Sequence, residues 1–348
     1  MLWEDVHAGY YLREKGGNMD PIYEFGLTMT RYLQETFPQL AGFFTFISTL
    51  GLEEFYLSLF PLIYWCIHKT VGKLFAYAFL ITNALNSLFK FSFRGPRPFW
   101  LDPSLEMWEE SSYGVPSGHV QLATVTYLFL AGWIRRWWAW LIAFVMIFLM
   151  GISRIYLGSH FPHDVVVGFV IAIIVLLGVI AWERSFAKGF KKRILGQKLM
   201  IALTVPVVYA MIFGVVALLI GKPDMSVVWS PYIAAAELAA WESAATAVGM
   251  LLGAGIGLIF EGSRIRFRAD GKIGLRIVRY LAGMGVTLLL WAGLKAIFPA
   301  DPLWLGLILR VLRYFLVALW ITYYAPWSFV KLKLADADPD PGIDLKIS

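Results

Sequence analysis

The chain has 348 residues, of which 59% are hydrophobic and only 16% are charged. A soluble globular domain carries more charge than this, so the composition indicates a protein embedded in a membrane. The net charge of +6 does not indicate a nucleic-acid partner, because the basic residues lie in short loops between apolar stretches, where membrane topology accounts for them. Cys66 is the only cysteine, which rules out an internal disulfide bond.

The first 40 residues contain acidic and aromatic side chains but lack the apolar core of a signal peptide, so we expect residues 1–40 to form an interfacial segment. Beyond them, apolar stretches of about 20 residues, the length that crosses a bilayer, recur along the chain. We therefore predict an all-α, polytopic membrane protein with about nine transmembrane helices. The predicted spans are 43–66, 72–93, 119–134, 137–156, 163–182, 199–220, 241–260, 276–297 and 303–324.

Basic residues are concentrated in alternate loops between these spans. They include Lys69 and Lys73, Arg135 and Arg136, the basic residues from 184 to 198, those from 264 to 272, and Lys331 and Lys333. The positive-inside rule places these loops and the C-terminus in the cytoplasm, and the N-terminus outside. Residues 94–118 and 157–162 are then expected on the outer side. The tail at 334–348, rich in Asp and Pro, is predicted to be disordered.

The first polar cluster on the predicted outer side is KFSFRGPRP, at residues 90–98. Lys90 and Arg97 are seven residues apart, nearly two helical turns, so on a continuing helix they face the same way. The glycine and the prolines that follow are expected to end that helix at the outer surface. Taken alone, either cation is better explained by contact with lipid head groups.

The second cluster is YGVPSGH, at residues 113–119. Ser117 and Gly118 stand just before a predicted helix, whose free backbone N–H groups and positive dipole end attract anions. Gly118 lets a ligand approach the backbone closely, and Ser117 adds a hydroxyl donor. His119 places a titratable side chain beside them. Taken alone, the pattern is also that of an ordinary helix cap.

The third cluster, at residues 153–164, contains Arg154, His160 and Asp164. On a helix, the spacing of four residues puts Asp164 one turn from His160, where a carboxylate fixes which ring nitrogen is free to react. The alternative is a metal site, because His160, His163 and Asp164 also have a possible metal-ligand spacing.

Together the clusters bring cations, two histidines, a carboxylate, a serine and a glycine backbone to one predicted side of the membrane. Several cations around one pocket require an anion with several oxygens, and phosphate fits because Arg offers it a forked pair of donors. With two histidines available, one attacks phosphorus and the other protonates the leaving oxygen. The conjunction favours phosphate chemistry over the separate explanation of each cluster.

These clusters resemble the three signature motifs of the type-2 phosphatidic acid phosphatase superfamily. The matching residues are Lys90-x6-Arg97-Pro98, then Pro116-Ser117-Gly118-His119, and Ser153-Arg154-x5-His160-x3-Asp164. The resemblance implies a helical phosphatase core over 41–185, followed by a four-span extension over 186–333.

The resemblance also implies a role for each site residue. His160 is expected to be the nucleophile that forms a phosphohistidine, Asp164 its orienting partner, and His119 the general acid for the leaving group. The phosphoryl oxygens are expected to be held by Lys90, Arg97, Ser117, Gly118 and Arg154. No metal or other cofactor is implied, so the enzyme is expected to be a metal-independent phosphoric monoester hydrolase.

Two branches of the superfamily are similar to this chain. Its length and the segments YEFGLTMTRYLQ and SRIYLGSHFPH are similar to glucose-6-phosphatase-like proteins, whereas Asp164 is typical of lipid phosphatases. We expect a lipid phosphate substrate, such as phosphatidate, isoprenyl phosphate or sphingoid-base phosphate. The alternatives are a sugar phosphatase, or a phospholipid or phosphate transporter that retains the site. Membrane lipids are the expected partners, and the site is expected to face outside a bacterial plasma membrane or the lumen of the endoplasmic reticulum.

The spans after residue 186 carry a ridge of small residues, Gly249, Gly253 and Gly257, which is predicted to pack closely on another helix. Arg310 and Arg313 fall inside the last span. Glu237 and Glu242, near the start of the seventh, are expected to pair with them across the bundle.

Overall fold

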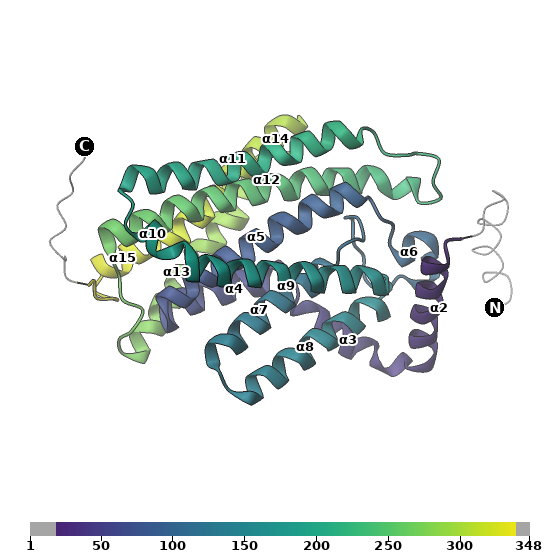
Figure 1. Cartoon of the computed structure of the whole chain (residues 1–348), viewed down its shortest axis with the longest axis horizontal. Coiled ribbons are helices and arrows are strands. Elements are labelled where there is room, and N and C mark those ends of the chain that lie inside the picture. The colour runs from purple at the N-terminus through teal and green to yellow at the C-terminus, as the bar shows by residue number, and fades with distance from the viewer. Residues whose placement is uncertain (1–18, 339–348) are drawn as a thin grey trace. The chain divides into compact units, whose positions relative to one another are not determined.

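The structure of the chain is a computed structural model that describes residues 19–338, without the side chains of residues 53 and 54 (Figure 1). Within this range all the named elements are helical, and one isolated β-bridge joins Phe267 and Ala337. The longer helices are α2 (Pro21–Thr36), α3 (Ala41–Thr49), α4 (Glu53–Pro61), α5 (Lys69–Phe93), α7 (Gly118–Ile134), α8 (Trp137–Tyr156), α9 (Pro162–Ser185), α11 (Leu195–Ile220), α12 (Ser230–Phe260), α13 (Ile273–Ile297) and α14 (Leu303–Leu319). Shorter pieces are α6 (Pro98–Leu101), α10 (Ala187–Lys191), α15 (Ala325–Lys331), the 3₁₀ turns Pro38–Leu40 and Pro103–Leu105, and the π-helical segments Leu62–Ile67, Glu261–Ile265 and Trp320–Tyr324.

The predicted fold class, an all-α membrane protein, is confirmed. Seven helices in the described range are long and apolar enough to cross a membrane. They cover Lys69–Leu101, Trp137–Tyr156, Pro162–Ser185, Leu195–Ile220, Ser230–Ile265, Ile273–Ile297 and Leu303–Lys331. α7 is shorter, at 17 residues, so the count of nine spans stays a prediction. Residues 1–18 and 339–348, which belong to the predicted interfacial segment and tail, lie outside the described residues.

Two predicted spans have the wrong bounds. The span predicted at 43–66 is not one helix, because α3 ends at Thr49 and α4 begins at Glu53. At the break, the Thr49 hydroxyl donates to the carbonyl of Phe46 (2.7 Å), and such side-chain bonds compete with the helical ladder. The span predicted at 241–260 begins earlier, at Ser230, since the alanine-rich sequence that precedes it favours a helix.

The described chain divides into two compact units, each built from three segments. The first contains residues up to Tyr56, Tyr77–Ala187 and Val208–Ala247, and the second contains Leu57–Ala76, Lys188–Val207 and the residues from Val248 onward. Each unit combines sequence from both sides of residue 185. The predicted division into a core at 41–185 and an extension at 186–333 therefore stays a prediction.

In the first unit, α7 packs against α8 and α9, and α8 also packs against α3 and α2. α8 turns small side chains inward, with Ala139 5% and Ala143 1% exposed, whereas Phe144 and Phe148 are largely exposed. Small residues between membrane helices let the backbones approach, and large apolar residues on the other side suit lipid. α2 is tied to this group through Gln34, whose amide donates to the carbonyl oxygens of Leu105 and Tyr156.

The first part of α12 also belongs to the first unit. Glu237 accepts two hydrogen bonds from the Arg94 guanidinium (2.8 and 3.1 Å) and one from the Tyr113 hydroxyl (2.7 Å). The expectation that Glu237 pairs with the arginines of the last span is therefore wrong: a nearer cation, at the end of α5, meets it. Arg94 has φ 49°, an uncommon conformation for a non-glycine residue, and this forked ion pair helps to hold it there.

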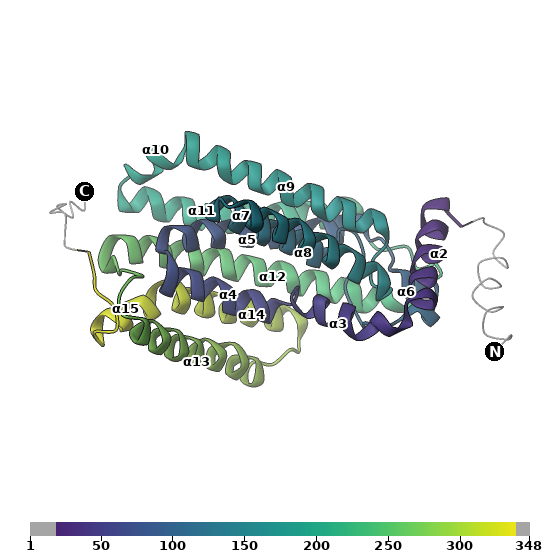
Figure 2. The same ribbon diagram turned by 90° about the horizontal axis from the view of Figure 1, so that it is seen from below.

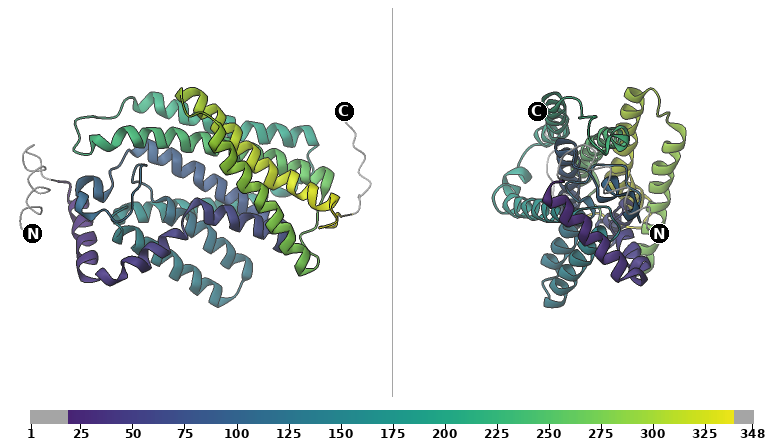
Figure 3. Two further views of the ribbon diagram at one scale, coloured as in Figure 1. Left: turned by 180° about the vertical axis from the view of Figure 1, so that it is seen from behind. Right: turned by 90° about the vertical axis from the view of Figure 1, so that its right-hand side faces the viewer.

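In the second unit, the predicted glycine ridge is confirmed, because the ridge of α12 lies directly against α14. A β-carbon at Gly249, Gly253 or Gly257 would collide with backbone or side-chain atoms of residues 311–322. α13 and α14 also lie side by side (Figures 2 and 3). Deeper in the unit, the fully buried carboxylate of Glu261 binds both Lys69 (2.5 Å) and Lys73 (2.7 Å).

Replacing Gly253 by alanine is expected to destabilise the protein. The added methyl group would collide with the carbonyl oxygen of Phe315 and lie 2.9 Å from the β-carbon of Ala318, and such overpacking costs about 1–3 kcal/mol. Gly285 of α13 is the matched control, since a β-carbon there meets nothing within 4 Å and alanine is favoured over glycine in a helix by about 1 kcal/mol. Thermal unfolding in detergent should show a lower Tm for Gly253→Ala and an equal or higher Tm for Gly285→Ala. Equal Tm changes in the two variants would contradict the close helix packing.

Candidate active site

The second polar cluster is at the helix start that the sequence predicts. Ser117 is the N-cap of α7 and Gly118 its first residue, so the first backbone N–H groups of the helix have no partner within it. The Ser117 amide donates to the carbonyl of Asp164 (3.0 Å). On α9, a β-carbon at Gly168 would lie 2.7 Å from the Ser117 carbonyl oxygen. The second and third clusters are therefore in direct backbone contact.

His160 and Asp164 do not share a helix, contrary to the expectation from their spacing. His160 lies in the turn between α8 and α9, because Pro162 is the first residue of α9 and favours that position. Asp164, in the first helical turn, accepts a hydrogen bond from the backbone N–H of Phe161 (2.9 Å) and lies 3.2 Å from Nδ1 of His160, through the same oxygen Oδ2. One carboxylate therefore both caps α9 and orients the imidazole.

The partners of His160 assign its tautomer. Nδ1 faces the Asp164 carboxylate, and Nε2 lies 3.3 Å from Nη1 of Arg97, which can only donate. Nδ1 therefore carries the proton and Nε2 the lone pair. Burial lowers the pKa of His160 well below its usual value, and Arg97 and Lys90 lower it further, so the imidazole is neutral at pH 7.

Lys90 and Arg97 of the first cluster are not on one helix either, because α5 ends at Phe93 and Arg97 follows in the next loop. They nevertheless converge on Ser112, whose hydroxyl accepts from Lys90 Nζ (3.1 Å) and from Arg97 Nη2 (2.9 Å). Both side chains also donate to the carbonyl of Tyr113, and Arg97 donates to the carbonyls of Ser112 (2.5 Å) and Ser159 (2.8 Å). Arg97 thus joins the loop before α7 to the turn before α9.

Arg154 approaches the same place from the last turn of α8. Its Nη1 donates to the hydroxyl of Ser48 on α3, and its Nη2 donates to Oε1 of Glu110 (2.7 Å). The guanidinium lies over the ring of Trp108, 5.6 Å from its centroid. The side chains of Arg97 and Arg154 are both fully buried.

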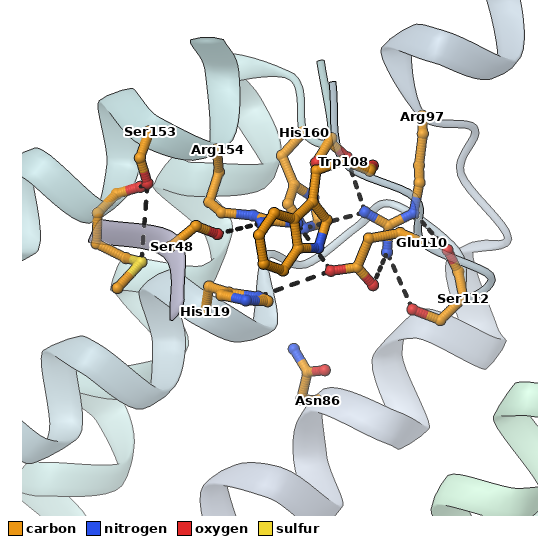
Figure 4. A network of polar contacts seen from close by, with 12 residues as sticks. Ser48, Asn86, Arg97, Trp108, Glu110, Ser112, His119, Ser153, Arg154 and His160 are labelled. Atoms are coloured by element: carbon orange, nitrogen blue, oxygen red, sulfur yellow. Dashed lines mark hydrogen bonds and ion pairs between the residues drawn. The ribbon is translucent and has the colours of Figure 1, made fainter. Parts of the chain in front are cut away.

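His119 faces Glu110 from the first turn of α7 (Figure 4), with 3.9 Å between Nδ1 and Oε1. Its imidazole also lies against the break between α3 and α4, where a β-carbon at Gly51 would collide with the ring. The break between α3 and α4 therefore matters for the site, because it lets the backbone at Gly51 approach His119 closely.

Glu110 is the main site residue that the sequence reasoning missed. Its carboxylate lies among Arg97, Arg154 and His119 (Figure 4), at 3.5 Å from Arg97 Nη2. Burial acts to raise the pKa of Glu110, but Arg97, Arg154 and then His119 outweigh it and lower the pKa to about 2. The only sequence signal was an acidic residue in a loop between two of the motifs. Ser48 carried no signal, because it is far from the motifs along the chain.

Among the residues expected to hold the phosphoryl group or its leaving oxygen, three buried polar atoms make no hydrogen bond within the described part of the chain. They are Oγ of Ser117, Nε2 of His119 and Nε of Arg154. Buried polar groups are almost always hydrogen-bonded, so such exceptions require an explanation. All three belong to residues that the motifs predict to hold a phosphoryl group or its leaving oxygen. Hydroxyl, imidazole and guanidinium groups are hydrogen-bond donors of the kind that suits an anion with several oxygens.

The metal alternative has less support from geometry. His160 and His163 face different oxygens of Asp164, with 3.1 Å between His163 Nε2 and Oδ1. Among the residues that the structure describes, no group of three His, Cys, Asp or Glu side chains is arranged to hold a metal ion. The donors that gather at the site are instead cations and hydroxyl groups, which suit an oxyanion.

Two family models match the chain. The PAP2 superfamily model matches residues 72–188, which include all three motifs, and the model of the PAP2 superfamily phosphatase transmembrane extension matches residues 245–337.

Similar proteins include glucose-6-phosphatase catalytic subunit 1 from several mammals. The protein from Rattus norvegicus is 28% identical over 45% of this chain and 52% of its own length, and that from Bos taurus is 30% identical over 47% and 53%. The chain thus aligns with about half the length of these relatives. The crystal structure of a transmembrane PAP2 type phosphatidylglycerolphosphate phosphatase from Bacillus subtilis aligns with a TM-score of 0.43 at 24% identity, covering 53% of this chain and 98% of that one. The matched family regions and the three complete motifs within them agree that this chain is a membrane-embedded member of the PAP2, or type-2 phosphatidic acid phosphatase, superfamily.

Proposed function

We propose that this protein hydrolyses phosphate monoesters through a phosphohistidine at His160, without a metal ion. The observation that carries the proposal is the set of buried polar atoms of Ser117, His119 and Arg154 that make no hydrogen bond within the described residues, together with the lone pair of a neutral His160 beside Arg97. Nucleophile, acid and anion-binding groups are then within one site, as covalent phosphoryl transfer requires.

In the first step, Nε2 of His160 attacks phosphorus and the bond to the ester oxygen breaks. The leaving oxygen takes a proton from His119, which must enter the step as an imidazolium. Arg97 lies 3.3 Å from Nε2 of His160, so a phosphoryl oxygen bound to Arg97 is brought beside the attacking nitrogen. The cations and the N-terminus of α7 stabilise the charge spread over the phosphoryl oxygens.

In the second step, water attacks the phosphohistidine. The now neutral His119 takes a proton from that water, and the P–N bond breaks to release phosphate and neutral His160. Asp164 keeps the proton of His160 on Nδ1 in both steps, so that Nε2 is the nitrogen bonded to phosphorus. A carboxylate held in this way stabilises the charged imidazole and fixes its tautomer.

A cavity beside the site bears on the choice of substrate. It has a volume of about 80 Å³, room for several water-sized groups. Six of its ten lining residues carry amide, hydroxyl or ammonium groups: Asn83, Asn86, Ser87, Lys90, Ser112 and Ser243 line it together with Tyr113 and three alanines. Amide and hydroxyl groups suit a hydroxylated leaving group better than an acyl chain. This favours a sugar or polyol phosphate, in line with the names of the relatives, over the lipid phosphate expected from sequence.

A substrate panel tests both the reaction and this choice. Purified protein in detergent with EDTA should release phosphate from glucose 6-phosphate or glycerol phosphate faster than from phosphatidate or isoprenyl phosphate, and vanadate should inhibit because its five-coordinate form resembles the transition state. Faster release from the lipids would restore the expectation from sequence. Loss of activity with EDTA and its rescue by zinc would support the metal alternative, and no release from any ester would favour a transporter.

Replacing either histidine should reduce turnover, but to a different extent. His160→Ala should abolish turnover of every substrate, because no covalent intermediate can form. His119→Ala should slow turnover by roughly 10²–10⁴-fold, and by less for p-nitrophenyl phosphate, whose leaving group hardly needs a proton. Acid-labile, base-stable phosphate should be trapped on the wild type and on His119→Ala only. Trapping on His160→Ala instead would reverse the two roles.

We also propose that the site faces the extracytoplasmic side, which rests on the charge of the loops. In a background with Cys66 replaced by alanine, a cysteine at Ser111, an exposed residue in the loop before α7, should react with an impermeant thiol reagent applied outside intact cells. A cysteine at Ser185, exposed at the end of α9, should react only after the cells are opened. The reverse pattern would overturn the orientation.

A further inference from the structure

Glu110 lies where a phosphoryl group is expected to bind. One carboxylate oxygen accepts from Arg154 Nη2 at 2.7 Å, and the other lies 3.5 Å from Arg97 Nη2. His119 is 3.9 Å from the first oxygen. Two cations of the predicted phosphate-binding set and the predicted general acid thus all face one internal anion (Figure 4).

A carboxylate and a phosphoryl group present oxygens of similar geometry to a guanidinium, so they compete for the same donors. A hydrogen that Nη2 of Arg154 donates to Glu110 is not available to a phosphoryl oxygen at the same time. The proposed reaction, however, needs these donors on the phosphoryl oxygens. Glu110 therefore has to move before phosphate can be fully bound.

We propose that Glu110 is an internal ligand of the phosphoryl-binding site, which the incoming phosphoryl group displaces and which returns as phosphate leaves. This inference rests on the proposed function and adds to it a residue that sets the affinity of the site for phosphate. Because its pKa is about 2, Glu110 stays an anion throughout the physiological pH range. It competes for the site at every pH in that range.

The surroundings of Glu110 allow such a movement, whereas those of the cations do not. Glu110 lies in the segment between Leu105 and Gly118, which forms no helix, and 20% of its side chain is exposed. Arg97 is fully buried and donates to three backbone carbonyls. Arg154 is fully buried and anchored on Ser48. A displaced Glu110 would leave both cations in position to receive the phosphoryl oxygens.

The alternative is that Glu110 is a fixed structural partner of the arginines. Removing a fixed partner from buried cations disturbs their positions and weakens anion binding. Removing a competitor strengthens anion binding, because the apparent affinity is proportional to the fraction of protein molecules whose anion site is free. A carboxylate that fills the site in about nine molecules of ten lowers the apparent affinity about tenfold. The two roles therefore predict changes of opposite sign.

The experiment is isothermal titration of the full-length protein in detergent with vanadate and, separately, with inorganic phosphate. Glu110→Gln is expected to bind both anions about tenfold more tightly or better than the wild type. Glu109→Gln is the matched control, since it removes the same charge from the adjacent, exposed residue and should leave the Kd within about twofold. Glu110→Asp, which keeps the charge on a shorter side chain, serves as a second variant and should give a smaller increase.

Unchanged or weaker binding by both Glu110→Gln and Glu110→Asp, with Tm values near that of the wild type, would overturn the inference and leave the proposed function intact. A gain of the same size in Glu109→Gln would also overturn it, because the effect would then come from net charge alone. Failure of the wild type to bind either anion would overturn the proposed function, and this inference with it.

Discussion

The structure of the first unit depends on one constraint, which is that it buries positively charged side chains in a mostly apolar helical protein. A buried charge is tolerated only if it is paired and hydrogen-bonded, and Arg97 and Arg154 are both fully buried. Arg97 meets this requirement with backbone carbonyls from two loops, and Arg154 with the hydroxyl of Ser48 and the carboxylate of Glu110. The hydrogen bonds that these buried cations require thus determine where the loops between the helices lie, and the loops in turn position the site.

The same solution recurs away from the site. Arg94 binds Glu237, which also accepts from Tyr113, so the loop before α7 is tied to the first part of α12. In the second unit, Glu261 binds two lysines, and the fully buried Arg279 donates to three backbone carbonyls. These buried charges are therefore paired or hydrogen-bonded inside their own unit, as the scarcity of water there demands.

The two histidines differ because their surroundings differ. His160 has both ring nitrogens engaged, Nδ1 by Asp164 and Nε2 by Arg97, which keeps one tautomer and one orientation. The buried Nε2 of His119 makes no hydrogen bond with the residues that the structure describes, and Nδ1 faces the carboxylate of Glu110 across 3.9 Å. A fixed neutral imidazole suits a nucleophile, and an imidazole beside an anion suits a group that must carry a proton. The division of roles implied by the family resemblance stays a prediction, and the two rings differ in these partners.

Sequence alone determined the membrane class, the start of α7 at Ser117 and Gly118, and the residues of the three motifs, because apolar length, helix caps and short motifs are local signals. Only the tertiary structure decided how those residues meet. It moved Arg97 and His160 from helices into loops, since proline ends or begins a helix at a point that residue spacing does not reveal. It divided the first predicted span and brought Gly51 against His119. It also added Ser48 and Glu110, which have no periodicity or motif of their own and become site residues only because distant helices bring buried cations to them.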